Sequence, residues 1–363
     1  MTQRSRVVRF DWIDADIELL MPFGIAGGTH DVARNTFVTV EIEGGFIGLG
    51  EAAPFPAFNG ETREAVHAAL AQTRDEVVGQ AFGGWRSIGS LTPPEAARIA
   101  SARCAVETAM LDAWLQAHRM PMWQFFGGAT DALATDCTIP TGTVDEAEAS
   151  AIRLADAGFR TLKLKVGGAS LTHDATRIEA VARTAPHCRL VFDANGGLGS
   201  VDDAVHLVQI ARAAGATVAL FEQPLPADAL GGMCEVHERT GVPVAADEGV
   251  ASVADVVRHA AARAAQVVNL KIMKSGVLGV LDIAAAARTL GIGLMVGGLV
   301  ETHIAMSTSA AIACGLGGVD FVDLDTPMFL RDAPVEGGYT QRGPLMGLGQ
   351  IAAGHGARLT NRP

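Results

Sequence analysis

Short apolar segments recur at nearly constant spacing along the chain after residue 134. Eight of them occur, at 135–140, 161–166, 190–195, 218–223, 242–248, 267–271, 293–298 and 321–325. The text between them has apolar positions at helical spacing, often closed by a glycine. A strand, a helix and two short loops use roughly 25 residues. The pattern therefore predicts an α/β fold, a modified TIM barrel of (β/α)7β type, rather than an open doubly wound sheet.

The chain before this repeat has a different pattern. Strand-like alternation covers residues 4–20 and 34–51, and Gly44-Gly45 predicts a turn between antiparallel strands. Residues 22–31 lie between these stretches, are rich in glycine and have neither helical nor strand periodicity. We therefore expect a loop there.

Helical spacing follows at residues 61–79 and 93–118, and Pro93-Pro94 suits the first turn of the second helix. We expect an α+β domain that caps the barrel and carries specificity loops near residues 22–31 and 54–60. The expected divisions are a capping domain at 1–130, the barrel at 131–326 and a C-terminal segment at 327–363 that returns to the capping domain.

Composition narrows the class of protein. Hydrophobic residues make up 49% of the chain, which excludes a mainly disordered protein. The formal net charge of −12 argues against a nucleic-acid partner. The charged N-terminus is unlike a signal peptide, and the uncharged stretch from Thr302 to Val319 is too polar to span a membrane. The five cysteines lack a CxxC motif and predict free thiols, so we expect a soluble, cytoplasmic protein.

Charged residues within the predicted barrel strands fall near the carboxyl ends of those strands. Active sites of this fold lie at that end of the barrel. Side chains two residues apart on a strand point the same way, so each Lys-x-Lys or Asp-x-Asp pair can face the barrel mouth. The residues are Lys163, Lys165, Asp193, Glu222, Asp247, Lys271, Asp323 and Asp325.

Three acids on consecutive predicted strands, Asp193, Glu222 and Asp247, would repel one another unless a positive charge lay between them. Carboxylate oxygens are ligands that Mg²⁺ prefers. The sequence therefore predicts a magnesium site. The alternative is a salt-bridge cluster in which Lys163, Lys165 and Lys271 neutralise the acids without a metal ion.

The predicted lysines come from opposite sides of the barrel. Lys163 and Lys165 are on the second strand, and Lys271 ends the sixth. Burial and a nearby cation lower the pKa of a lysine, which allows the neutral amine to act as a base. A metal-bound carboxylate makes its own α-carbon more acidic, because the metal stabilises the enediolate. A base on each face of that carbon predicts a 1,1-proton transfer, which is an epimerisation or racemisation.

These motifs resemble the enolase superfamily in its muconate-lactonising subgroup. The matching text is KLK (163–165), FDAN (192–195), FEQP (221–224), ADE (246–248) and NLK (269–271). Within the subgroup, MVGGLVET (295–302) and DLDTPMFL (323–330) are similar to dipeptide epimerases such as L-Ala-D/L-Glu epimerase. The resemblance covers nearly the whole chain.

The resemblance implies a role for each matching residue. Lys165 and Lys271 would be the two acid/base catalysts, and Lys163 would assist at the substrate carboxylate. It also implies one Mg²⁺ per subunit, a dipeptide substrate and a homo-oligomer. The resemblance also implies roles for further residues. Asp193, Glu222 and Asp247 would be the metal ligands, and Asn195 and Glu248 would support those ligands. The substrate would be bound by Asp323, Asp325 and Gly298.

One departure from that family concerns specificity. Glutamate-specific epimerases hold the substrate's side-chain carboxylate with an arginine in the first-domain loop, but residues 19–33 contain no Arg or Lys. We therefore do not expect specificity for Ala-Glu. Asp31 and Glu51 could instead line a pocket for a cationic or neutral side chain.

Other activities remain open from the sequence. N-succinylamino-acid racemase, o-succinylbenzoate synthase and muconate cycloisomerase share the site, but Asp323 and Asp325 would repel their anionic or N-acylated substrates. A Schiff-base lyase would use Lys271 or Lys165 to form an imine. A non-catalytic metabolite-binding barrel is a third alternative.

Overall fold

The computed structural model describes residues 5–25, 28–168 and 170–360, with the backbone alone for those between 21 and 30. Its larger part is an eight-stranded parallel sheet in which neighbouring strands follow one another in the chain. The N–H of Asp136 donates to the carbonyl of Val322 (2.9 Å) and links the sheet's two edge strands. The strands are β6 (Cys137–Ile139), β7 (Thr161–Lys165), β8 (Arg189–Asp193), β9 (Thr217–Glu222), β10 (Val244–Ala246), β11 (Val267–Leu270), β12 (Gly293–Val296) and β13 (Phe321–Val322).

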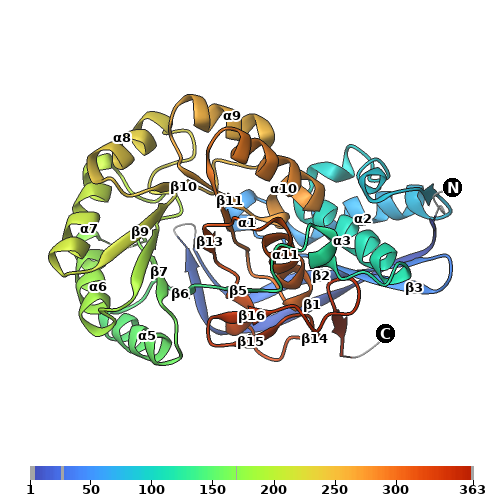
Figure 1. Ribbon diagram of the computed structural model, residues 1–363, viewed down its shortest axis with the longest axis horizontal. Helices are drawn as coiled ribbons and strands as arrows, with labels where there is room; N and C mark the ends of the chain where they lie inside the picture. The colour runs from blue at the N-terminus through green and yellow to red at the C-terminus, as the bar shows by residue number, and fades with distance from the viewer. Residues whose placement is uncertain (1–4, 26–27, 169, 361–363) are drawn as a thin grey trace.

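A helix joins each strand of this sheet to the next, so the predicted (β/α)7β barrel is confirmed. Figure 1 shows α5 to α9 along the outer side of the strands. Most of these helices begin at a Ser or Thr whose side chain accepts a backbone N–H of the first turn, as at Thr143 and Ser200. They are α5 (Val144–Asp156), α6 (Leu171–Thr184), α7 (Val201–Ala213), α8 (Leu230–Thr240), α9 (Val253–Ala261), α10 (Ile272–Thr289) and α11 (His303–Leu316).

The N-terminal part packs an antiparallel sheet against helices, as predicted. The strand order is β3-β2-β1-β4, and the turn between β2 and β3 contains Gly44 and Gly45. Its elements are β1 (Ser5–Ile25), β2 (Gly28–Ile42), β3 (Phe46–Ala52), β4 (Ala81–Phe82), α1 (Pro56–Asn59), α2 (Arg63–Val77), α3 (Ala100–Ala117) and α4 (Met122–Phe125), with short 3₁₀ turns at Trp85–Ile88 and Ala96–Arg98.

Two local predictions in this part were wrong. The expected loop at 22–31 is largely strand, because β1 and β2 continue to pair there, with Phe23 opposite His30. Residues 26 and 27 and the side chains of 21–30 lie outside the described part. The second helix begins at Ala100 rather than at Pro93, because the 3₁₀ turn before it ends at the extended backbone of Ile99.

Close packing of β3 on α3 holds the capping sheet in place. A Cβ atom added to Gly50 would lie 1.9 Å from the carbonyl oxygen of Ala105, and one added to Gly48 would lie 2.0 Å from that of Ala109. Both neighbours are backbone atoms in a helix, so they cannot move aside as a flexible side chain could. Glycine at these two positions therefore sets the distance between strand and helix.

We expect Gly50→Ala to lower the free energy of unfolding by about 1–3 kcal/mol or more, because the strand must move away from α3. Gly231→Ala is the matched control, since nothing lies within 4 Å of a Cβ there and alanine favours its helix, α8. Thermal unfolding of both variants measures the effect. Equal melting temperatures would contradict the packing argument.

The C-terminal segment contacts the capping domain. The N–H of Met122 donates to Gly354 O (2.8 Å), and the N–H of His355 donates to Asp112 on α3 (3.1 Å). Its strands are β14 (Val335–Gly337), β15 (Thr340–Arg342), β16 (Leu345–Gly347) and β17 (Ala357–Leu359), with β16 paired to β5 (Ala132–Ala134), after a 3₁₀ turn at Thr326–Phe329. The divisions at residues 130 and 326 stay predictions.

The cysteines are all free, as expected, and four of the five are buried. None of the helices in the described residues is long and apolar enough to cross a membrane. The expected cytoplasmic location and homo-oligomeric state stay predictions.

Candidate active site

The predicted polar residues lie at the carboxyl ends of the barrel strands, and all are buried. Parallel pairing sets Lys165 beside Asp193, and Asp193 beside Glu222. Lys163 lies two residues before Lys165 on β7, and the other members follow the ends of β10, β11 and β13. The structure thus brings the whole set to one rim: Lys163, Lys165, Asp193, Glu222, Asp247, Lys271, Asp323 and Asp325.

Each of the three predicted metal ligands contacts a lysine ammonium group. Lys163 Nζ lies 2.9 Å from Asp193 Oδ2 and 2.8 Å from Glu222 Oε2. Lys165 Nζ lies 2.6 Å from the same oxygen of Asp193, and Lys271 Nζ lies 2.6 Å from Asp247 Oδ2. Cationic groups therefore occupy positions next to all three acids.

Two residues of this site were not predicted from the sequence. Lys274, in the first turn of α10, places Nζ 2.7 Å from Asp247 Oδ1, and Asn269 on β11 donates to Glu222 Oε1 (2.6 Å). A signal for Lys274 was present, because the chain contains four lysines in all and the other three were already assigned to the site. Asn269 stands two residues before Lys271, a spacing that puts both on one side of the strand.

The lysines set the charge state of two of the acids. Burial would raise the pKa of Asp193, but the ammonium groups of Lys163 and Lys165 outweigh it and hold the pKa below its ordinary value. Lys271 and Lys274 do the same for Asp247. Glu222 differs, because burial and the neighbouring charge of Asp193 raise its pKa to about 7.

The expected lowering of the pKa is not found for Lys271 or Lys163 among these contacts. Burial does lower the pKa of Lys271, but Asp247 and Glu222 raise it further, and the net pKa is above the ordinary value. The pKa of Lys163 is raised in the same way by Asp193, Asp323 and Glu222. An amine among carboxylates is stabilised as ammonium, so these lysines can become bases only where another cation takes over the acids.

The donor set fits Mg²⁺. Asp193, Glu222 and Asp247 are fully buried carboxylates on three adjacent strands, and hard oxygen ligands suit this ion. The ion pairs of the salt-bridge alternative are also present, because Lys163 contacts Asp193 and Glu222, and Lys271 contacts Asp247. A divalent cation would compete with the lysines for the same oxygens.

Asn195 and Glu248 lie next to this cluster, as expected. Asn195 Oδ1 accepts a hydrogen bond from Lys165 (2.8 Å), and its Nδ2 donates to Glu248 Oε1 (3.0 Å). Asn195 has a positive φ of 44°, a conformation that asparagine tolerates better than most residues. The contacts orient Lys165 between Asp193 and Asn195, which agrees with a supporting role for Asn195.

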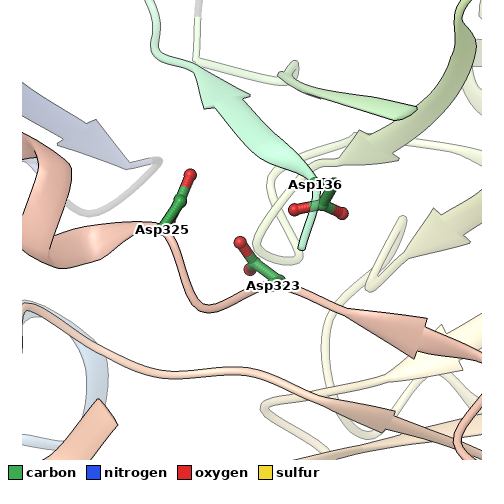
Figure 2. Close-up of side chains that lie close together, drawn as sticks. All are labelled: Asp136, Asp323 and Asp325. Carbon is green, nitrogen blue, oxygen red and sulfur yellow. The ribbon is translucent and has the colours of Figure 1, made fainter. Parts of the chain in front are cut away.

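Asp323 and Asp325 follow β13 and lie on the rim beside β6 and β7. Lys163 Nζ lies 2.6 Å from Asp323 Oδ2, and the N–H of Thr138 donates to Asp325 Oδ2 (2.6 Å). Figure 2 shows the two carboxylates together with that of Asp136. Burial followed by the charge of Asp323 raises the pKa of Asp325 to about 7. Asp323 is therefore paired with an ammonium group, whereas Asp325 accepts its hydrogen bond from the neutral N–H of Thr138.

Lys163, Lys165 and Lys271 line a small cavity of about 30 Å³, and a second cavity of about 390 Å³ shares Phe55 and Val300 with it. Phe55 and Phe58, from the predicted loop at 54–60, line the small cavity, and the Phe58 ring lies 5.2 Å from Lys271 Nζ. Gly298 also lines it, and a Cβ added there would lie 2.1 Å from Cε of the buried Met306. Glycine at this position therefore lets the cavity wall pack closely on Met306.

The two expected specificity acids have different positions. Asp31 is exposed and lines the larger cavity. Glu51 does not line either cavity, because its buried carboxylate accepts the N–H and hydroxyl of Thr302 and the N–H of Ala305 at the start of α11. The structure thus places Glu51 at the start of α11 and away from both cavities. Arg34, which directly follows the lysine- and arginine-free stretch 19–33, lines the larger cavity.

Comparison with known proteins places the chain in a family. Residues 12–127 match the model of the mandelate racemase / muconate lactonizing enzyme N-terminal domain, and residues 146–361 match that of the enolase C-terminal domain-like family. The chain belongs to the enolase superfamily. Both matches together span the capping domain, the barrel and most of the C-terminal segment of this superfamily member.

The relatives of this enolase-superfamily chain include named epimerases. An aromatic dipeptide epimerase of Herpetosiphon aurantiacus is 41% identical over 95% of this chain and 96% of its own. A mandelate racemase/muconate lactonizing enzyme structure from Sorangium cellulosum has 51% identity and a TM-score of 0.92 over 98% and 99% of the two chains. The dipeptide epimerase of Enterococcus faecalis V583, solved with Mg and L-Leu-L-Tyr, has 28% identity and a TM-score of 0.90 over 97% and 99%.

Proposed function

We propose that this protein is a magnesium-dependent dipeptide epimerase that inverts the α-carbon of the C-terminal residue of its substrate. The observation that carries the proposal is the position of Lys165 and Lys271. They lie on β7 and at the end of β11, four strands apart in an eight-stranded barrel, so they face each other across the mouth. The named relatives with magnesium and dipeptide complexes support the same function.

Asp193, Glu222 and Asp247 would hold the metal ion, supported by Asn269, Asn195 and Glu248. Mg²⁺ bound there supplies a positive charge that makes the α-proton of a substrate carboxylate more acidic. Lys163 lies between Asp193, Glu222 and Asp323 and would present its ammonium group to the same substrate carboxylate.

The two opposed lysines would move the proton. The neutral amine of one lysine accepts the α-proton from one face of the substrate, which leaves a planar carbon. The ammonium group of the other lysine returns a proton to the opposite face, and the configuration inverts. Asn195, which accepts a hydrogen bond from Lys165, would keep that amine directed into the cavity.

Asp325 would pair with the free ammonium group at the N-terminus of the dipeptide. Asp323 already forms an ion pair with Lys163, so the carboxylate of Asp325 is the one that would bind the substrate ammonium group. A charge-assisted hydrogen bond of this kind would distinguish a free dipeptide from an N-acylated one.

The pH dependence tests this role. Since the pKa of Asp325 is raised to about 7, the carboxylate needed for the ammonium forms only as the pH rises through that value. We expect kcat/KM for a free dipeptide to fall about tenfold per pH unit below that value. The pH dependence of kcat/KM reflects the pKa of groups in the free enzyme, so it tests Asp325 before substrate binds. Asp325→Asn should remove this limb and raise KM. The same limb in the variant, or with an N-acylated dipeptide, would exclude Asp325.

The larger cavity supports a preference for apolar or aromatic side chains. Its wall includes Leu19, Val32, Phe55 and Val300, and its two charged residues, Asp31 and Arg34, are of opposite sign. The name of the Herpetosiphon relative supports the same preference. We therefore propose that Ala-Glu is not the preferred substrate.

A dipeptide library incubated in D₂O tests the function without prior choice of substrate, since deuterium uptake detected by mass spectrometry reports turnover. We expect uptake at the C-terminal residue of apolar and aromatic dipeptides. Arg34→Gln, run beside the parent, should leave that ranking unchanged. No uptake in any dipeptide would reject the function. Best turnover of Ala-Glu, lost in Arg34→Gln, would reject the proposed preference alone.

A further inference from the structure

Asp136, which directly precedes β6, is a buried carboxylate without a donor. Its side chain is in the barrel interior with 4% of the residue exposed, and neither Oδ1 nor Oδ2 accepts a hydrogen bond from any N–H or O–H in the described residues. Asp136, Asp323 and Asp325 have carboxylate oxygens within 4.8 Å of one another. Figure 2 shows Asp136 next to Asp323, with Asp325 farther along the same loop.

Asp323, the second acid of this group, also has one carboxylate oxygen without a hydrogen-bond donor in the described part of the chain. Asp323 Oδ2 is paired with Lys163, but Asp323 Oδ1 is buried and accepts no hydrogen bond from a donor among the described groups. Two adjacent buried carboxylates with unsatisfied oxygens would repel each other and would lose the hydrogen bonds that water gave them. A single proton shared by the two acids would give one of them an O–H donor and would remove one of the two negative charges.

We propose that Asp136 is a positioning residue for the ammonium-binding acids, a neutral carboxylic acid whose O–H donates to Asp323. This inference rests on the proposed function. Lys163 on one oxygen of Asp323 and Asp136 on the other would hold that carboxylate in a single orientation. The fixed Asp323 in turn sets the loop that carries Asp325.

The surroundings of Asp136 agree with a neutral acid. Burial and then the charge of Asp323 raise the pKa of Asp136 well above its ordinary value, and Lys163 only partly offsets them. Asp325, after β13, and the Cys137 thiol on β6 also act on it or lie beside it, and Arg160, Arg189 and Asp320 line the same cavity of about 220 Å³ as Asp136. If all three acids were ionised, they would attract a divalent cation or further protons. If Asp136 is neutral, the two carboxylates of Asp323 and Asp325 and the ammonium group of Lys163 together carry one negative charge, which matches one substrate ammonium group.

The competing interpretation is that all three acids are ionised and hold a metal cation. Asparagine at position 136 separates the two interpretations, because its amide N–H₂ can still donate to Asp323 but cannot supply a carboxylate ligand. Alanine removes the donor and leaves Asp323 Oδ1 unsatisfied.

We test the inference with Asp136→Asn and Asp136→Ala in the magnesium-loaded enzyme. We expect Asp136→Ala to raise KM for a free dipeptide about tenfold, as the loss of one buried hydrogen bond allows, with a smaller change in kcat. Asp136→Asn should restore most of that loss. The infrared difference spectrum of the parent minus each variant should contain the carbonyl band of one buried protonated acid, because the other buried acids with a raised pKa, such as Glu301, contribute equally to both proteins.

Three results would overturn the proposal: a KM for Asp136→Asn as high as for Asp136→Ala, a difference spectrum without the band, or a second bound Mg²⁺ in equilibrium dialysis that both variants lose. Circular dichroism shows whether the variants are folded, and the difference spectrum against Asp136→Asn is informative even if Asp136→Ala does not fold. The α-proton exchange of the parent is measured separately. Its absence would reject the proposed function, whereas the infrared band would still report the state of Asp136.

Discussion

Lys165→Ala and Lys271→Ala are each expected to lower kcat for epimerisation by roughly 10²- to 10⁴-fold, the usual contribution of a positioned acid or base. In the proposed mechanism each lysine serves one face of the substrate, and the opposite lysine, four strands away in the sheet, would not replace it. Epimerisation needs both faces, so the loss of either amine blocks both directions. A coupled assay or polarimetry of a purified dipeptide epimer measures the rate.

Lys165→Arg is the matched control for charge. Arginine can keep an ion pair with Asp193, but it does not lose its proton near neutral pH and so cannot act as the base. We expect Lys165→Arg to bind Mg²⁺ and to remain as inactive as Lys165→Ala. Near-parental epimerisation in Lys165→Arg would show that the charge of Lys165, and not its proton transfer, matters.

Removal of the metal is the second large effect. A chelator is expected to abolish epimerisation, and added Mg²⁺ is expected to restore it. The physical reason is competition for oxygens: Lys165 and Lys271 pair with Asp193 and Asp247 at 2.6 Å. Asp247 raises the pKa of Lys271, so a cation must take over that carboxylate before the Lys271 amine can act as a base. Full activity in the chelated enzyme, with trapping of substrate by borohydride, would favour the Schiff-base alternative and contradict the account.

The lysines also allow this competition to be observed directly. The chain has four lysines, all of them in the barrel mouth, so protein labelled with ¹⁵N-lysine gives side-chain signals from the site alone. Titration with Mg²⁺ should shift the Nζ signals of Lys165 and Lys271. A control titration of Asp247→Asn should shift them far less, because a ligand is lost. Unchanged signals in the parent would contradict competition for the acids.

The barrel and most of its site were predictable because both follow from local periodicity. A closed ring of parallel strands brings every strand end to one rim, so Asp193, Glu222 and Lys271 meet although they are distant in sequence. The positions of charges along the repeat were therefore sufficient. The pairing of Asp323 with Lys163 also follows from the ring, because β13 and β6 are its joined edges and β7 is next to β6.

The missed features depend on contacts that have no local pattern. Glu51 caps a helix whose first residues are some 250 positions away, at Thr302 and Ala305, and nothing near Glu51 in the sequence indicates that partner. Asp136 looked like part of an ordinary strand, and only the tertiary structure sets it against Asp323. The strand at 22–25 was missed because pairing with a neighbouring strand overrides the turn tendency of glycine.

The most direct test of the two-base mechanism is α-proton exchange in D₂O by Lys165→Ala and Lys271→Ala, measured by mass spectrometry on each purified epimer of one dipeptide. The account predicts that each variant exchanges the α-proton of one epimer alone, and that the two variants choose opposite epimers. If both variants exchange the same epimer, or if both still convert one epimer into the other, the two lysines do not act on opposite faces and the mechanism is wrong.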